Sequence, residues 1–293
     1  MSTIRKAGNK TSRTEVPAMM PTRRDLKFRL PAEKIASWNG GSAHVSHFMN
    51  TLSIVFPVGE RFFIQSVRNY RDRITDPELG KAVTAFIGQE AMHGREHEEY
   101  NEALFARVPY AQKFEAHIGR LLSWVQKKMP NSYQLSATIA LEHFTAILAH
   151  ALLSEPRVLE HADPRFAALW RWHALEETEH KSVAFDVWEK VMGRGPRAYV
   201  VRSFGLLIAS LIFWREIIPA YLRILRAEGK LGDRNGWRQW FRLSLGEVGM
   251  LRRIILPWAD YFRPNFHPWD HDNRHFLSQV ESLAAPYQSR ASA

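Results

Sequence analysis

Two short motifs in this sequence place a carboxylate and an imidazole three residues apart. Glu90-Ala-Met-His93 and Glu177-Thr-Glu-His180 are the two Glu-x-x-His segments of the chain. Residues three apart lie on the same face of a helix, so each motif can direct both of its side chains at one point. Carboxylate oxygen and imidazole nitrogen are ligands that suit iron, manganese and zinc. Each motif therefore predicts part of a metal site.

Each motif follows a glutamate that lies in an apolar segment. Glu60, in IVFPVGERFF, precedes Glu90 by thirty residues, and Glu142, in SATIALEHFTAILAHALL, precedes Glu177 by thirty-five. Antiparallel neighbouring helices joined by a turn would bring each glutamate level with its motif. Four buried carboxylates would repel one another and lose their hydration unless cations were present. The predicted site holds two metal ions, iron before manganese or zinc, and its ligands are Glu60, Glu90, His93, Glu142, Glu177 and His180.

Two further histidines are predicted to face the same site. His97 is one helical turn after His93, and His173 is one turn before Glu177. We expect both to support the ligands by hydrogen bonds from behind, and service as a seventh ligand is the alternative for either one. Three polar residues next to the ligands in sequence should point elsewhere and serve the structure: His143, Glu176 and Glu179.

Long helical segments must position these residues, and no alternating strand pattern stands out, so we predict an all-α fold. Asp76-Pro77 and Asp163-Pro164 are helix start signals, and Pro57 predicts a kink in the first helix. A long connection, 106–130, precedes the third main helix, as a four-helix bundle with one crossover requires. The helices are expected at 43–73, 77–105, 111–128 (inside the connection), 131–153, 164–192, 197–229 and 234–256.

The organisation of the chain follows from these segments and from its composition. We expect a disordered basic tail at 1–34, the metal-binding bundle at 35–195, additional helices packed on the bundle at 196–256, and an irregular tail at 257–293. The hydrophobic content of 45% allows a sizeable core. The absence of cysteine excludes disulfides, iron–sulfur clusters and thiolate metal sites.

The net charge of +10 is unevenly distributed along the chain. Basic residues prevail at 1–34 and 194–263, whereas 76–193 holds seventeen acids against twelve bases. Basic flanks around an acidic centre do not suit nucleic-acid binding. The apolar stretch 203–226 is too short for a clear membrane span, because Arg215 and Glu216 interrupt it. A buried helix or one lying on an anionic membrane surface is expected instead.

Location and partners are expected from the same features. Residues 1–27 are polar and basic, so we expect no signal peptide. We expect a cytoplasmic protein, with a peripheral position at the inner membrane face as the alternative. For the oligomeric state, a homodimer is one alternative.

The motifs resemble those of known proteins. The order Glu, Glu-x-x-His, Glu, Glu-x-x-His is similar to that of the ferritin-like di-iron carboxylate superfamily. The segments FPVGERFF, EAMHGREH, LEHFTA and HALEETEHKSVAFDVW resemble more narrowly the bacterial family labelled "predicted metal-dependent hydrolase", over roughly residues 40–260. The resemblance implies a ferritin-like helical bundle with additional C-terminal helices and a two-metal centre.

Three functions compete on this basis. We expect a di-iron enzyme that activates dioxygen to oxidise a small hydrophobic molecule, because the superfamily resemblance implies this chemistry and the chain is rich in Trp and Phe. The alternative is a hydrolase in which two metal ions activate a water molecule. A further alternative is an iron-oxidising or structural metal-binding helical protein.

Overall fold

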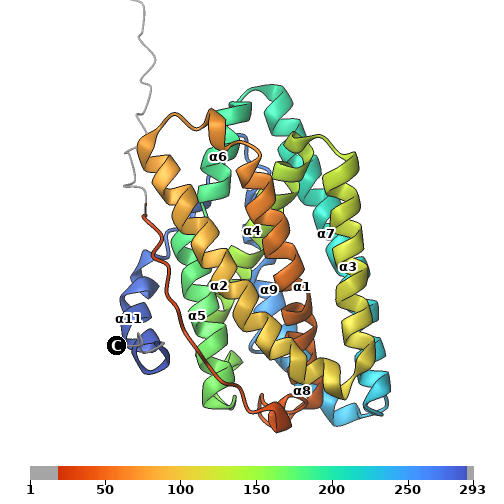
Figure 1. The fold of residues 1–293 in the computed structure, drawn as a ribbon. Helices are drawn as coiled ribbons and strands as arrows, with labels where there is room; N and C mark the ends of the chain where they lie inside the picture. Colours follow the sequence, from red (N-terminus) through yellow and green to blue (C-terminus); the bar gives the residue numbers. More distant parts are fainter. Residues whose placement is uncertain (1–18, 289–293) are drawn as a thin grey trace, which may run out of the picture.

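The segments that carry the predicted ligands form four long helices that pack side by side (Figure 1). The computed structural model describes residues 19–288. The four helices are α1 (Ala43–Arg68), α2 (Pro77–Arg107), α4 (Asn131–Ser154) and α5 (Pro164–His180). Helix α1 contacts α2 and α4, and α5 contacts the same two helices, so the four enclose a common interior. The all-α prediction is confirmed, with no β-strand among residues 19–288; the ferritin-like assignment stays a prediction.

The two predicted Asp-Pro start signals open α2 and α5. Asp76 Oδ1 accepts a hydrogen bond from the backbone N–H of Glu78 at 2.9 Å, and Asp163 Oδ1 accepts one from Arg165 at 3.0 Å. Each aspartate thereby satisfies a backbone donor that has no partner inside the helix, and the proline after it has no N–H to leave unpaired. These caps fix where the two motif-bearing helices begin.

Helix α1 continues through Pro57 instead of ending there. Proline lacks the N–H that would bond to the carbonyl of the residue four positions earlier, Ser53. The side-chain amide of Asn101, on α2, donates to this Ser53 carbonyl at 3.0 Å. A neighbouring helix thus supplies the missing donor at the level of the predicted metal site.

The fourth long helix was predicted as one element and is two. Helix α5 ends at His180, and α6 (Val183–Met192) follows after a turn at Lys181. The ammonium group of Lys181 is buried and donates to two acceptors of the C-terminal segment, the backbone oxygen of His271 and Oδ1 of Asn273, each at 2.6 Å. Such contacts lie far away in sequence, so no local signal marked this break.

Two helices complete one side of the molecule. Helix α3 (Pro109–Lys128) connects α2 to α4 and contacts α1, and α7 (Pro196–Ala227) packs along α4, α1 and α3. Figure 1 shows α3 and α7 beside the bundle, away from α2 and α5.

The predicted helix at 234–256 is divided into shorter pieces. These are α8 (Arg234–Ser244), which packs on α1, and α9 (Met250–Arg253) and α10 (Ile255–Asp260), which pack on α4. Gly249 between them has a φ of 67°, a left-handed conformation that ends regular helix. The prediction of one continuous helix here is wrong.

The N-terminal segment also differs from its prediction. We expected disorder over 1–34, but residues 19–31, the N-terminal strap, run in an extended path along the face formed by α2 and α5 (Figure 1), and Ala32–Lys34 form a short 3-10 helix. Leu26 and Phe28 are buried there, and Lys27 N–H donates to the Tyr287 carbonyl at 2.8 Å. Apolar burial and this pairing with the C-terminal segment hold the strap in place. Residues 1–18 lie outside the described part.

The C-terminal segment forms short helical turns rather than a fully irregular tail. They include α11 (Val280–Ala284), which packs on α5. The last residues of the predicted tail, 289–293, lie outside the described part.

Candidate metal centre

The second motif meets two glutamates from neighbouring helices in the interior of the bundle. His180 Nε2 lies 3.1 Å from Glu90 Oε1, 3.5 Å from Glu177 Oε2 and 3.7 Å from Glu142 Oε2. All four side chains are buried. Glu90, Glu177 and His180 offer atoms within 4.8 Å of one another, a spacing that could hold a metal ion.

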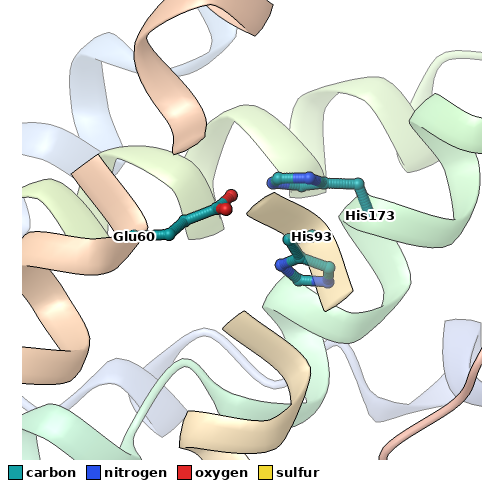
Figure 2. A group of neighbouring side chains, drawn as sticks. All are labelled: Glu60, His93 and His173. Atoms are coloured by element: carbon teal, nitrogen blue, oxygen red, sulfur yellow. The ribbon is translucent and has the colours of Figure 1, made fainter. Parts of the chain in front are cut away.

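A second group lies beside the first and contains Glu60, His93 and His173. Their candidate ligand atoms are also within 4.8 Å of one another, and Figure 2 shows the Glu60 carboxylate directed toward the two imidazole rings. His173 was predicted to support ligands from behind. The structure groups its ring with Glu60 and His93, which is the arrangement that the alternative of a seventh ligand requires.

Glu177 lies between the two groups. Its Oε1 is 3.1 Å from His173 Nε2 and 3.9 Å from His93 Nδ1, while its Oε2 faces His180 at 3.5 Å. A carboxylate with one oxygen directed at each group can bridge two metal ions. The structure therefore brings together the six predicted residues and His173 around two adjacent positions.

Many of the buried polar atoms that face the two positions lack hydrogen-bond partners. Among residues 19–288, no hydrogen bond reaches the carboxylate oxygens of Glu60, Glu90 and Glu142, nor His93 Nδ1, His173 Nε2 or His180 Nε2. The short approaches given above do not have hydrogen-bond geometry. Each unsatisfied buried polar group costs about 1–3 kcal/mol, and more when it is charged. Bound cations would satisfy all of these atoms at once, so the residues fit a pair of metal ions.

The pKa values of two of the carboxyl groups, Glu60 and Glu142, also favour bound cations. Burial raises the pKa of Glu60 well above its ordinary value, and the neighbouring carboxylates of Glu90, Glu177 and Glu142 raise it further. The pKa of Glu142 is raised well above its ordinary value by the same causes. Without bound cations the carboxyl groups of Glu60 and Glu142 would take up protons rather than remain ionised beside the other carboxylates.

The outward nitrogens of two histidines are held by polar residues. His93 Nε2 lies 3.2 Å from Glu176 Oε2, and His180 Nδ1 lies 3.0 Å from Gln89 Oε1. Gln89 Nε2 in turn donates to Glu179 Oε2 at 2.6 Å. Such partners orient ligand histidines and fix which ring nitrogen carries the proton.

A cation from the N-terminal strap anchors these carboxylates. Arg24 donates to Glu176 Oε1 at 3.1 Å and to both oxygens of Glu179, at 3.0 and 2.9 Å. Burial raises the pKa of Glu176 to about 8, and the charge of Arg24 acts against this rise. We expected Glu176 and Glu179 to point away from the site. Instead, Glu176 contacts His93 directly, and Glu179 is connected to His180 through Gln89.

The third histidine is supported by a chain of hydrogen bonds. His173 Nδ1 lies 2.9 Å from His97 Nε2, and His97 Nδ1 lies 2.8 Å from Ser53 Oγ. The Ser53 hydroxyl donates to Asn101 Oδ1 at 2.8 Å. His97 therefore occupies the supporting position that the sequence predicted.

His143 and a third cluster of possible ligands form hydrogen bonds outside the centre. His143, expected to be structural, points away from the centre, and its Nε2 lies 3.0 Å from the Pro257 carbonyl oxygen. Asp186, Glu189 and His267 form a third spatial group of possible ligands. There His267 Nε2 bonds to Asp186 Oδ1 at 3.0 Å, and Nδ1 accepts from Trp269 N–H at 3.2 Å, so neither ring nitrogen is free.

The chain was compared with families, with curated proteins and with solved structures. Residues 22–272 match the family described as "Predicted metal-dependent hydrolase". No curated protein and no solved structure matched. The family match includes every residue of the centre described above, the helical bundle, and the strap from residue 22 onward. Because it covers most of the sequence, the chain belongs to the predicted metal-dependent hydrolase family.

Proposed function

We propose that this protein is a metal-dependent hydrolase whose centre holds two metal ions. The sequence alone led us to expect oxidation first and hydrolysis second, and the family supports the second. The observation that carries the proposal is the set of buried Glu oxygens and His nitrogens without hydrogen-bond partners, arranged around two positions with Glu177 between them.

The seven residues would divide between the two positions. Glu60, His93 and His173 would hold one ion, and Glu90, Glu142 and His180 the other, with one Glu177 oxygen for each. Four carboxylates would balance the charge of two divalent ions. When bound, such ions polarise a carbonyl or phosphoryl oxygen and lower the pKa of a water molecule. The donor set accommodates iron, manganese or zinc.

Aromatic side chains fix the imidazole rings and keep the centre dry. The ring centroid of Phe86 lies 5.1 Å from that of His180, and Trp172 lies 4.8 Å from His93, both edge-on. Phe56 lies 4.6 Å from His173. Apolar walls strengthen the electrostatic interactions of the site by excluding water. They also suit a small hydrophobic substrate, which is the substrate class that we propose.

Oxidation by dioxygen remains the second candidate function, and one observation favours it. The centre is enclosed by helices and aromatic rings, with every predicted ligand at most 2% exposed. A small reactant reaches such a site more easily than a large ester does. An iron-oxidising or structural role is the third candidate. A protein with such a role would neither hydrolyse esters nor oxidise an organic substrate.

Metal analysis combined with two activity assays tests the proposal. Metal content is measured on protein purified without added metal, followed by hydrolysis of a panel of short acyl and phosphate esters and by oxygen uptake after reduction. We expect two ions per chain and ester hydrolysis that is lost in Glu142→Ala but kept in Glu102→Ala, an exposed acid on α2. Iron with oxygen uptake and no hydrolysis would favour oxidation. Protein without metal, or Glu142→Ala with two ions fully bound, would overturn the centre itself.

A further inference from the structure

Helix α7 is apolar, yet most of it is not buried. Two helices of residues 19–288 are long and apolar enough to cross a membrane, α4 and α7, with mean hydropathies of 1.3 and 1.5. In α4, 72% of the apolar segment is buried in the bundle, as expected of a core helix. In α7 only 22% is buried. The apolar residues of α7 therefore need another explanation than the core of this chain.

The exposed apolar residues of α7 lie on one face of the helix. Apart from the adjacent pair Leu207 and Ile208, they are three, four or seven residues apart, the spacing of a single helical stripe. They are Val200, Phe204, Leu207, Ile208, Leu211, Ile218 and Leu222. The opposite face, with Leu206, Ile217 and Ile224, is buried against the bundle. Because α7 is attached along its length, it cannot cross a bilayer alone, but it can lie flat on one.

Helices α8 to α10 extend this surface. Phe241, Leu245, Ile255 and Leu256 are exposed, and Leu256 is 78% exposed. A groove of about 510 Å³ joins two of them, Leu245 and Ile255, to Ile218 and Leu222 of α7. We call the exposed apolar residues of α7 and these four residues the apolar face. Isolated exposed apolar residues are ordinary, but a contiguous patch of this kind marks an interaction site.

Exposed arginines without ion pairs lie on the same helices as the apolar face. Arg197 and Arg226 lie at the two ends of the α7 stripe, and Arg234, Arg238 and Arg252 lie on α8 and α9. All five are exposed, and none forms an ion pair with another residue of 19–288. Four half-buried tryptophans also line the groove: Trp214, Trp237, Trp240 and Trp258. Arginine and tryptophan are the residues that anchor proteins at the headgroup layer.

We propose that the apolar face binds the surface of an anionic membrane, with α7 parallel to the bilayer. The apolar stripe enters the acyl boundary, and the exposed arginines contact anionic headgroups. A second copy of this chain fits the face less well. A two-fold axis near the middle of α7 would place Arg197 of one copy beside Arg226 of the other, and like charges would repel. The proposal does not depend on the reaction at the metal centre.

Vesicle co-sedimentation tests the proposal with the full chain. The vesicles are phosphatidylcholine alone, or phosphatidylcholine with about one third phosphatidylglycerol, at low and high salt. We expect binding to the anionic vesicles that weakens at high salt. Arg226→Glu with Arg238→Glu should weaken it about 25-fold or more, since each arginine near an anionic surface contributes about fivefold. Leu211→Glu with Leu256→Glu should weaken it at least tenfold at either salt concentration.

Two control variants test whether changes in charge or hydrophobicity outside the apolar face also alter vesicle binding. Arg171→Glu changes an exposed arginine of α5, and Trp124→Glu changes an exposed aromatic residue that lines a separate depression between α1 and α3. Both should bind vesicles like the parent protein, and circular dichroism and metal content show that each variant folds. Equal vesicle binding by all variants, or no binding by the parent, would overturn the proposal. A dimer in size-exclusion chromatography that Leu211→Glu dissociates, without lipid binding, would assign the face to a second copy instead.

Discussion

The outward ring nitrogen of His93, Nε2, lies 3.2 Å from Glu176 Oε2, and this contact leaves Nδ1 turned toward Glu177. Glu176 is held in turn by Arg24, which comes from a strap outside the bundle. The strap thus reaches a ligand histidine through one intervening carboxylate.

Substitution of Arg24 should therefore weaken metal binding although no ligand is lost. In Arg24→Gln, Glu176 loses its buried cation and no longer holds the His93 ring firmly. We expect metal affinity to fall about 10–100-fold, the usual cost of removing such a supporting partner, measured by competition with a chromophoric chelator. Arg171→Gln, an exposed change on α5, is the control. Unchanged affinity in Arg24→Gln would show that the strap only covers the bundle.

His173 and His97 should differ in their effect on metal content. His173→Ala removes a nitrogen that faces Glu177 Oε1 at 3.1 Å, so one of the two ions should be lost. His97→Ala leaves that nitrogen in place and removes only its support, so both ions should bind, about 10–100-fold more weakly. Metal analysis after dialysis distinguishes the two results. Two tightly bound ions in His173→Ala would return His173 to a purely supporting role.

Glu142→Gln should change stability in opposite directions without and with metal. In the metal-free protein the pKa of Glu142 is raised well above 4.5, mainly by burial. The stabilisation that comes with the bound proton is present below the unfolded pKa and is lost as pH rises toward the folded pKa. The neutral glutamine avoids this loss. As pH rises above about 4.5, the melting temperature of the variant should therefore exceed that of the parent by a growing margin. The margin should grow by roughly 3–5 °C for each pH unit between the unfolded and the folded pKa of Glu142.

With metal bound, the order of the two proteins should reverse. The parent gains binding free energy from the Glu142 carboxylate, and the glutamine variant gains less. Melting curves at several pH values, recorded with a chelator and with added metal, give both comparisons. A Glu142→Gln difference that does not vary with pH in the chelated protein would contradict the raised pKa.

Gly94→Ala should disturb the centre through contact with a single ligand. A methyl group at position 94 would lie 3.2 Å from Glu60 Oε2 and 4.0 Å from the Pro57 Cα, so the carboxylate must shift. We expect lower metal affinity and a loss of about 1–3 kcal/mol in the free energy of unfolding. Gly80→Ala, on the same helix with no atom within 4 Å of the added carbon, is the control and should be neutral or stabilising. Equal behaviour of the two variants would contradict the close approach.

Much of the fold follows from local sequence signals. The Asp76 and Asp163 caps start their helices where predicted, because a side-chain oxygen followed by proline acts on neighbouring backbone groups. The turn after His180 was missed because Lys181 is held by residues ninety positions later in the chain. The strap was missed although Leu26 and Phe28 are two residues apart, because so short a strand-like alternation does not reveal which helices the segment will cover.

The residues of the centre were also predictable as far as local spacing determines them. Spacing along helices indicated which side chains share a face, and the structure brings the predicted residues together. Spacing could not tell whether His173 or His97 lies innermost, since both are one turn from a motif residue and the answer depends on how α2 and α5 cross. Glu176 points away from its own helix neighbours and toward His93 of α2, a relation between helices that no single segment records.

The proline in α1 has a consequence for proton positions at the centre. Because Pro57 leaves the Ser53 carbonyl without a helical donor, the Asn101 amide turns its N–H₂ toward that carbonyl and its oxygen toward the Ser53 hydroxyl. That hydroxyl donates to the amide oxygen, so it must accept from His97 Nδ1–H, and His97 Nε2 must then accept from His173 Nδ1–H. His173 is thereby fixed as the tautomer whose Nε2 carries a lone pair rather than a hydrogen. The proline in α1 thus determines the tautomer of His173 on α5, and this tautomer has a free lone pair on Nε2 with which to bind a cation.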